Sequence, residues 1–326
     1  MSMLTVIFLA LILTIITTSF VRLSVTEQRQ AIDDDLTTRA FYAAESGVED
    51  AKRAIARFQA SQPVNLNADE CQPADVVPDG VLSADLDTEY TCQLIDMSPA
   101  NFQAELSIWE AVTIPLRASG PFNAVRIDWH IYNAGDSYNR RGNSAQDLPT
   151  MPSWTGSNYP AMLRSGIFSH PNSANFASDQ VAQSVMFLNP AVSVQSSNLS
   201  NDGQIRNGGC AASPNSGQYA CTTTISGVNS ARTFYLRLQS LYRGTNVQVT
   251  LLDNGTPVPL DDVQAIVDVT ARAGDVFRRV EARVSLITDG FPFPDIALWS
   301  NTDICKDFTV TDEVADYIND CPWANP

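Results

Sequence analysis

Few residues in this chain could perform acid–base or nucleophilic chemistry. The 326 residues include only two histidines, His130 and His170, and neither lies in a GxSxG or HExxH pattern. His130 falls within an alternating segment, where we expect an exposed surface side chain. Because no nucleophile, base and orienting group occur together in a recognisable arrangement, the sequence predicts a protein that is not an enzyme, with no catalytic residue and no cofactor.

Acidic residues gather at three places that could attract a cation. They lie at Asp33–Asp35, at Asp261–Asp262 and between Asp303 and Asp320. None has the DxDxDG spacing of a calcium loop, so we expect the first group to be a solvated helix face and predict no metal site. The alternative is calcium bound near the last group, at Asp307, Asp312, Glu313 and Asp316.

The six cysteines form three couples that are close in the sequence. They are Cys71 and Cys92, Cys210 and Cys221, and Cys305 and Cys321. The spacing is wider than in a zinc knuckle or a redox CxxC motif, so it predicts disulfides in an oxidising compartment, with buried free cysteine as the alternative. Six cysteines allow many pairings, and we expect the nearest-neighbour one because short loops cost least entropy to close.

Other candidate binding residues carry weaker signals. Two triplets, Asn198-Leu199-Ser200 and Asn254-Gly255-Thr256, permit glycosylation of Asn198 and Asn254, although such triplets are common by chance. The net charge of −16 leaves no basic face for phosphates, so no nucleic-acid partner is predicted. We expect the tryptophans in the core or in a subunit interface, with a ligand surface as the alternative: Trp109, Trp129, Trp154, Trp299 and Trp323.

The start of the chain is an apolar segment. Met3–Val21 contains nineteen residues without charge, and Arg22 is the first charged residue. As a helix it would be about 28 Å long, enough to cross most of the hydrocarbon core of a membrane. No basic residue precedes the segment and no small-residue cleavage site follows it. We therefore expect it to be retained in the mature protein, with any basic leader already removed.

The helical pattern continues beyond this segment. Proline is absent before Pro63, and Gly47 is the only glycine before Gly80. Small and apolar residues recur at three- and four-residue steps between Leu36 and Phe58, which predicts one helix from near residue 3 to near residue 59. Its second half would present a stripe of small residues suited to close packing under a sheet or against other helices.

This arrangement resembles that of type IV pilins and pseudopilins. The resemblance is carried by the apolar helix, its amphipathic continuation and the C-terminal cysteines, and AFYAAESGVEDA (Ala40–Ala51) is similar to the same part of larger minor-pilin-like proteins. It implies an α+β fold, with a long N-terminal α-helix (residues 1–60, apolar half 3–21) packed on an antiparallel β-rich head (residues 61–326) with long disulfide-stapled loops. The pair Cys305–Cys321 resembles the C-terminal disulfide loop of pilins, over residues 303–326.

The resemblance also implies a function. The chain would be a structural subunit of a type IV pilus-like extracellular filament, a fimbrium on the cell surface, and it would be inserted in the inner membrane before assembly. Its partners would be other copies of itself in a helical assembly and the pilus assembly machinery. The helix residues that would carry assembly are Leu4, Ile7, Phe8, Leu11, Ile15, Arg22, Glu27 and Arg29.

One residue departs from the pilin pattern. Pilins usually carry glutamate where this chain has Thr5, and the lack of that carboxylate is similar to tip-type pseudopilins. A minor or tip pilin is therefore one alternative. A plain membrane anchor carrying an adhesive ectodomain, active in cell adhesion, is the other.

Two further expectations concern the middle of the long helix. β-Branched residues and nearby hydroxyl groups predict a weak stretch between Thr14 and Thr26. Arg22, Glu27 and Arg29 are expected to form charge pairs with each other or with neighbouring subunits, because an isolated charge is costly inside a helical bundle.

From residue 63 onward the helical period gives way to the alternation of strands. Val263–Ala271 and Val276–Ile287 form the best hairpin candidate, with a turn at residues 273–275. Residues 134–232 are rich in Asn, Ser, Gly and Pro and predict a loop-rich insertion. The clearest single strands are expected at Val125–Ile131, Phe234–Leu238 and Val247–Leu251.

Overall fold

The computed structural model describes residues 2–62, 66–72, 80–143, 149–171 and 182–287, and for residues 2–8, 10 and 12 it describes the backbone alone. The chain divides into two compact units, Met1–Ile287 and Thr288–Pro326, and every described element belongs to the first. Outside the described residues lie the predicted loop 303–326, its Cys305–Cys321 disulfide, the alternative calcium ligands, Trp299 and Trp323.

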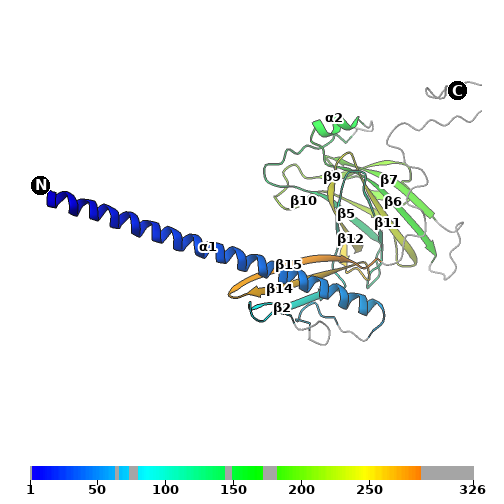
Figure 1. Cartoon of the computed structure of the whole chain (residues 1–326). Helices are drawn as coiled ribbons and strands as arrows, with labels where there is room; N and C mark the ends of the chain where they lie inside the picture. The colour runs from blue at the N-terminus through cyan, green and yellow to red at the C-terminus, as the bar shows by residue number, and fades with distance from the viewer. Residues whose placement is uncertain (1, 63–65, 73–79, 144–148, 172–181, 288–326) are drawn as a thin grey trace, which may run out of the picture. The chain divides into compact units, whose positions relative to one another are not determined.

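One helix, α1 (Ser2–Gln59), runs without a break through the predicted range (Figure 1). It ends in a Schellman motif, in which Ser61 adopts a left-handed φ of 58° and Gln62 donates to the Arg57 carbonyl over 3.1 Å. The predicted weak stretch is wrong, because its hydroxyl groups donate to carbonyls three or four residues earlier, over 2.7 to 3.1 Å, and the helix continues. These hydroxyls belong to Thr14, Thr17, Thr18, Ser19 and Thr26.

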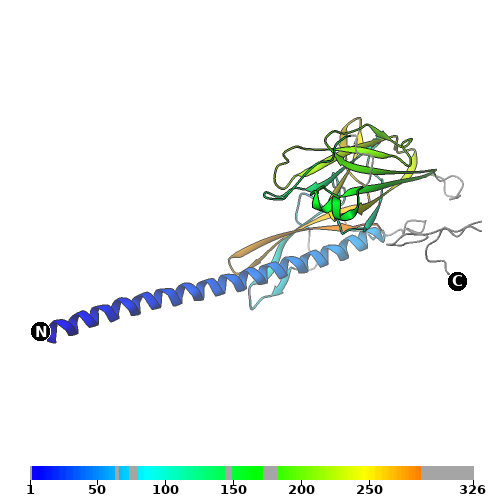
Figure 2. The same ribbon diagram turned by 90° about the horizontal axis from the view of Figure 1, so that it is seen from above.

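The second half of α1 packs on a four-stranded antiparallel sheet, as both views show (Figures 1 and 2). The strand order is β1 (Val81–Ser83), β2 (Thr88–Asp96), β14 (Gln264–Ala273) and β15 (Val276–Ser285). The predicted hairpin is present as β14 and β15, which pair from Gln264 with Ser285 to Ala273 with Val276. Its turn places Gly274 at φ 58°, a conformation that glycine adopts readily.

Small side chains let α1 lie close to this sheet. Gly47 is a point of close approach, since a Cβ there would lie 2.6 Å from Val269 Cγ1. The Gly47 carbonyl also accepts a 2.7 Å hydrogen bond from Gln93 Nε2 of β2. The buried helix residues of this core are Ala43, Ala44, Val48, Ala51, Ala54 and Ile55, and they meet Tyr90, Ile95, Ala265, Val267, Val269 and Ala271 of the strands.

The larger sheet has eleven strands. Its main order is β13-β12-β5-β10-β9-β7-β6-β11-β4, with β3 also paired to β12 and β8 to β10. The pairs β7–β9 and β8–β10 are parallel and the others are antiparallel. The strands are β3 (Phe102–Leu106), β4 (Ala111–Pro115), β5 (Ala124–Ile131), β6 (Met162–Pro171), β7 (Ala182–Ala191), β8 (Ser197–Asn198), β9 (Ile205–Cys210), β10 (Tyr219–Ser226), β11 (Arg232–Leu241), β12 (Thr245–Asp253) and β13 (Thr256–Val258), and a short helix, α2 (Met151–Gly156), precedes β6.

A second hydrophobic core lies within this larger sheet. Trp129 of β5 is fully buried and donates its indole N–H to the Ala161 carbonyl over 3.0 Å. The two sheets are joined by a reciprocal amide pair, in which Gln103 N–H donates to Gln264 Oε1 over 3.0 Å and Gln264 Nε2 donates to the Gln103 carbonyl over 2.9 Å. Other fully buried members of the core are Ile114, Val125, Ile127, Leu163, Leu188, Leu236, Val247 and Val249.

The predicted fold class is wrong. The structure is mostly antiparallel β, with 44% strand and 22% helix, and the larger sheet nearly closes on itself, so this is not the helix-packed α+β fold of a pilin. The predicted long loops are also wrong, because β6 to β10 run through residues 134–232. The physical reason is that polar side chains in this region are buried and bonded to one another: Asn189 Nδ2 donates to Asn207 Oδ1 over 3.0 Å, and Asn207 Nδ2 donates to the Asn143 carbonyl over 2.8 Å.

Candidate functional site

The first half of α1 exposes a run of large apolar side chains. Their exposed fractions range from 42% at Val25 to 72% at Phe20. In both views this half of the helix lies away from the strands (Figures 1 and 2). The run, which we call the apolar α1 segment, consists of Leu9, Leu11, Leu13, Ile15, Ile16, Phe20, Val21, Leu23 and Val25.

The apolar α1 segment is not a stripe on one side of the helix. At about 100° per residue, its side chains point in directions spread around the whole helix axis. A stripe would suit contact with one partner, whereas this distribution offers apolar surface to several neighbours. Among the residues whose placement is described, no helix reaches the length and hydropathy needed to cross a membrane.

The residues predicted to carry assembly all lie on α1. Leu11 and Ile15 belong to the apolar α1 segment, while Leu4, Ile7 and Phe8 lie in the part of the helix of which only the backbone is described. Arg22, Glu27 and Arg29 are exposed. Within the described part of a single chain no ion pair joins these three residues, so the predicted charge pairs are not made within one subunit.

Several charges on the second half of α1, in contrast, are paired within the helix. Arg39 bonds Asp35 over 2.5 Å and Arg53 bonds Asp50 over 2.5 Å. Asp50 also accepts a 2.9 Å hydrogen bond from the Tyr90 hydroxyl, which ties this part of the helix to β2. Such pairs on a solvent-exposed helix face contribute little to stability, about 0.3 to 0.5 kcal/mol each.

A groove of about 740 Å³ runs beside this half of the helix. Its lining joins α1 to the two edge strands of the smaller sheet and includes Tyr42, Glu45, Val48, Leu82, Val280 and Ala282. Lys52 and Glu49, which also line it, pair with each other over 2.6 Å. These groups are ordinary surface charges, and their arrangement indicates no reaction.

The two acidic groups that the structure describes, Asp33–Asp35 and Asp261–Asp262, do not assemble a metal centre. Asp33, Asp34 and Asp35 are exposed on α1, as predicted for a solvated helix face. Asp262 pairs with Arg117 over 3.3 Å. In the parts of the chain that the structure describes, no group of three or more His, Cys, Asp or Glu residues could hold a metal ion.

His130 is half-buried, so the prediction of an exposed surface histidine is wrong. Its ring stacks on Tyr138, with centroids 5.6 Å apart and planes 10° apart. Burial, followed by the nearby Arg243, lowers the pKa of His130, and Asp136 opposes this shift. Burial also raises the pKa of Tyr138 to about 12, against the opposing effect of Arg140.

His170 lies at the end of β6, away from His130. Its Nδ1 lies 2.8 Å from the Pro171 carbonyl, and its ring stacks on Tyr235 at 6.1 Å. Both histidine rings therefore pack on tyrosines, and the contacts that they make are those of structural side chains.

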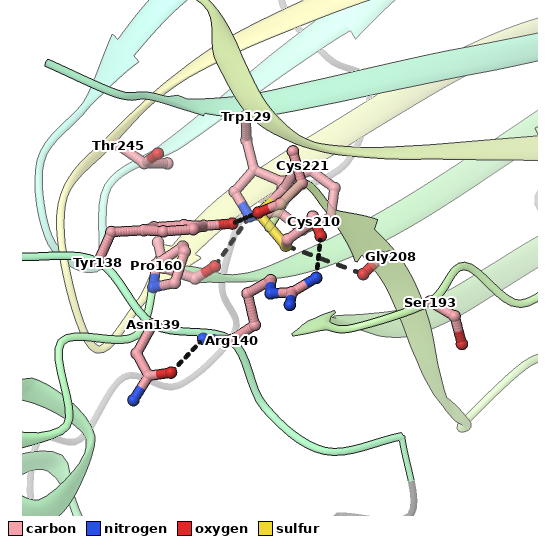
Figure 3. The surroundings of a disulfide bond; sticks show 12 residues. Trp129, Tyr138, Asn139, Arg140, Pro160, Ser193, Gly208, Cys210, Cys221 and Thr245 are labelled. Carbon is pink, nitrogen blue, oxygen red and sulfur yellow. Dashed lines mark hydrogen bonds between the residues drawn. A yellow bond between two sulfur atoms is a disulfide. The ribbon is translucent and has the colours of Figure 1, made fainter. Parts of the chain in front are cut away.

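Two of the predicted disulfides are confirmed. Cys71 pairs with Cys92 and ties the segment after α1 to β2, and Cys210 pairs with Cys221. The second pair joins directly opposed residues of β9 and β10, as Figure 3 shows. There Arg140 donates from Nη1 to the Cys210 carbonyl over 3.1 Å.

The two glycosylation triplets lie at the surface. Asn198 is exposed, and its Oδ1 accepts a 2.9 Å hydrogen bond from the Ser200 N–H. Asn254 is exposed in the turn between β12 and β13, and its Nδ2 donates to Asp253 Oδ1 over 3.0 Å. Glycosylation at both positions stays a prediction.

The tryptophans divide between core and surface. Trp129 and Trp154 are fully buried, as expected for core residues, whereas Trp109 is 41% exposed. Trp109 belongs to a chain of aromatic rings that also contains Tyr242, Trp154 and Tyr159. Sequence reasoning missed this grouping, because its members come from segments far apart in the chain and no local spacing marks them.

Comparisons with known proteins add no assignment: no protein-family model, no curated protein and no solved structure matches this chain.

Proposed function

We propose that this chain is a structural subunit of a type IV pilus-like extracellular filament, assembled through the first half of α1. The observation that carries the proposal is the apolar α1 segment, nine exposed large hydrophobic side chains on a helix whose other half is fixed to a sheet. Contiguous exposed apolar surface of this size marks an interaction site in a stable protein.

The distribution of these side chains favours a bundle of copies. Each buried square ångström of apolar surface contributes about 25 cal/mol, so a helix that is apolar on all sides gains most when neighbours surround it. Copies of the same chain provide neighbours of matching length and character. In the proposed assembly these contacts are heterologous and do not close into a ring, which is how an open helical filament arises.

The charges beside the apolar α1 segment fit the same arrangement. Arg22 and Glu27 carry opposite charges and have no pairing with each other in the described part of one chain. Five residues along a helix correspond to about 7.5 Å, so neighbours offset by that distance would bring Arg22 of one copy level with Glu27 of the next. Paired in this way, both charges are tolerated close to an apolar bundle.

The proposed location is a filament at the cell surface. Two disulfides support an oxidising, extracellular compartment. Before assembly, the uncharged run Met3–Val21 would hold the subunit in the inner membrane, and the pilus assembly machinery would extract it. Thr5 favours a second candidate within this proposal, a minor or tip subunit, and immunogold labelling of filaments separates the two by labelling along the length or at the ends.

The test is electron microscopy of material sheared from cells that express the full chain. Glu27→Ala is expected to reduce filament yield, while the amount of monomer in the membrane fraction stays at the wild-type level. Asp85→Ala, which removes one exposed carboxylate from the β1–β2 turn, is the matched control and should leave the yield unchanged.

Two results would count against the proposal. Cells with abundant wild-type chain but no filaments would favour the anchored adhesive ectodomain instead. Equal filament yields for Glu27→Ala and Asp85→Ala would show that this charge takes no part in assembly.

A further inference from the structure

Four aromatic rings form a continuous chain from the surface to the buried Trp154 of α2; we call it the aromatic ladder. Trp109 packs against Tyr242 with centroids 6.4 Å apart, Tyr242 stacks on Trp154 at 4.5 Å with planes 8° apart, and Trp154 meets Tyr159 edge-on at 5.5 Å. The Arg141 guanidinium lies 5.1 Å from the centre of the Trp154 ring. The ladder thus runs from an exposed indole to a fully buried one.

The backbone at the ladder adopts uncommon conformations. Trp109 has φ 68°, Tyr242 has φ 70° and Asn158, next to Tyr159, has φ 55°. The left-handed region is sparsely used by bulky side chains such as that of tryptophan, because it strains their backbone. Trp109 and Tyr242 are both held in this unfavourable backbone conformation, which indicates that contacts around them fix the position of their rings.

The backbone of Trp109, at the exposed end of the ladder, is fixed by two hydrogen bonds. The Trp109 N–H donates to the Ser240 carbonyl over 2.9 Å, and the Trp109 carbonyl accepts from Gln239 Nε2 over 3.0 Å. Arg243, the residue after Tyr242, donates from Nη1 to the Tyr159 carbonyl over 3.2 Å and so links the two segments that carry these tyrosines. The indole itself packs against the Tyr242 ring. A ring positioned in advance in this way loses less entropy when a ligand binds than a free one.

Two polar groups belong to the outer end of the ladder, the carboxylate of Glu110, the residue after Trp109, and the hydroxyl of Tyr242. Glu110 is exposed directly after Trp109, and one of its carboxylate oxygens accepts a 2.7 Å hydrogen bond from the Ser107 N–H. The Tyr242 hydroxyl has no hydrogen-bond partner among the residues that the structure describes. The outer end of the ladder therefore combines a flat apolar face with groups that accept or donate hydrogen bonds.

We infer that the outer end of the aromatic ladder, Trp109 and Tyr242 with Glu110, is a binding site for a neutral saccharide. A sugar ring presents a flat face of C–H groups to an aromatic ring and hydroxyls at its rim, which match the indole, the phenol and the carboxylate. Two outer rings offer far less than the roughly 1,000 Å² that a specific protein interface needs. The net charge of −16 disfavours polyanionic ligands.

This inference does not depend on filament assembly and is tested on the full chain in solution. The probes are soluble, uncharged oligosaccharides, namely cello-, malto-, manno- and galacto-oligosaccharide series, followed by quenching of tryptophan fluorescence. Wild type is expected to bind at least one series, and Trp109→Ala to weaken that binding by about tenfold, the loss of one good aromatic contact. Trp109→Phe should retain part of the affinity.

Phe277→Ala is the matched control, because Phe277 is an exposed aromatic residue of β15 outside the ladder. It should bind as wild type does. Tyr242→Phe keeps the stacked ring and removes only the hydroxyl, so it tests the site even if Trp109→Ala fails to fold, and it should weaken binding severalfold. The inference is overturned if wild type binds no neutral series, if it binds only polyanions, or if both ladder variants bind as wild type.

Discussion

Gly47 is a residue at which α1 lies too close to the smaller sheet to leave room for a Cβ. A methyl group there would lie 2.6 Å from Val269 Cγ1 and 3.2 Å from Gln93 Nε2. Gly47→Ala gains about 1 kcal/mol in helix propensity but must push the helix away from β14, at a cost of about 1–3 kcal/mol. We expect a net loss of up to about 2 kcal/mol in the free energy of unfolding, measured by denaturant titration followed by circular dichroism.

The control for this substitution is Gly156→Ala. Gly156 ends α2, and a Cβ there would have nothing within 4 Å. Its free energy of unfolding should stay within about 0.5 kcal/mol of wild type. Equal stability of the two variants would mean that the close approach of α1 and β14 is not tightly packed.

His130 predicts a pH dependence of stability. Its pKa in the folded chain is lowered below 6.5 by burial and by Arg243, so the folded state favours the neutral ring. The unfolded chain then binds the proton more readily, and stability that is fully present above about pH 6.5 is lost as the pH falls through the folded pKa. Between about pH 7.5 and about pH 5, we expect the melting temperature of His130→Gln to fall by less than that of the wild type. Parallel losses in the two proteins would contradict this.

At the scale of elements, the sequence predicted the parts whose periodicity is uninterrupted. α1 and the β14–β15 hairpin could be found because apolar residues recur at helical or strand spacing and a glycine marks the turn. β9 (IRNGGC) could not, since Asn and Gly are typical of a loop, and β10 (YACTTTIS) was missed because it follows a stretch rich in Asn, Ser and Gly. Asn207 of β9 and Thr223 of β10 are buried by pairing with β7 and β5, and Gly208 of β9 is needed where the Trp129 ring lies against the backbone.

The two disulfides staple different elements, which predicts separable effects. Cys71–Cys92 closes a loop of 21 residues between the end of α1 and β2, and its removal in Cys71→Ser/Cys92→Ser should cost about 3 kcal/mol of stability. The loss should appear in the helical signal at 222 nm, because this loop connects α1 to its sheet. Cys210→Ser/Cys221→Ser, which frees β9 and β10 of the other sheet, serves as the comparison.

If both double variants lowered the helical signal equally, the expectation that Cys71–Cys92 specifically holds α1 to its sheet would be contradicted. Peptide mapping of the wild-type chain under non-reducing conditions checks the pairings first. Peptides joined as Cys71–Cys92 and Cys210–Cys221 are expected, and the predicted third pair, Cys305–Cys321, is tested in the same map.

At the scale of the whole molecule, the residues that stabilise the fold of the described unit are distinct from those of the exposed apolar α1 segment. The buried face of α1 holds the smaller sheet, the reciprocal Gln103–Gln264 amide pair joins that sheet to the larger one, and the apolar α1 segment takes no part in either core. The sequence could indicate the apolar segment and the small-residue face separately. It could not indicate the near closure of the larger sheet or the aromatic ladder, since both depend on pairings between distant segments.

This separation predicts that assembly and folding respond to different substitutions on one helix. Phe20 is 72% exposed, so Phe20→Ser should leave the melting temperature of the chain unchanged but reduce self-association, because it places a hydroxyl inside the proposed bundle. Ala51 is fully buried against the sheet, so Ala51→Leu should lower stability by about 1–3 kcal/mol through overpacking. Chemical cross-linking and sedimentation of the purified full chain measure association, and thermal unfolding measures stability. A Phe20→Ser chain that associates as wild type does would remove the apolar α1 segment from the assembly interface, whatever the behaviour of Ala51→Leu.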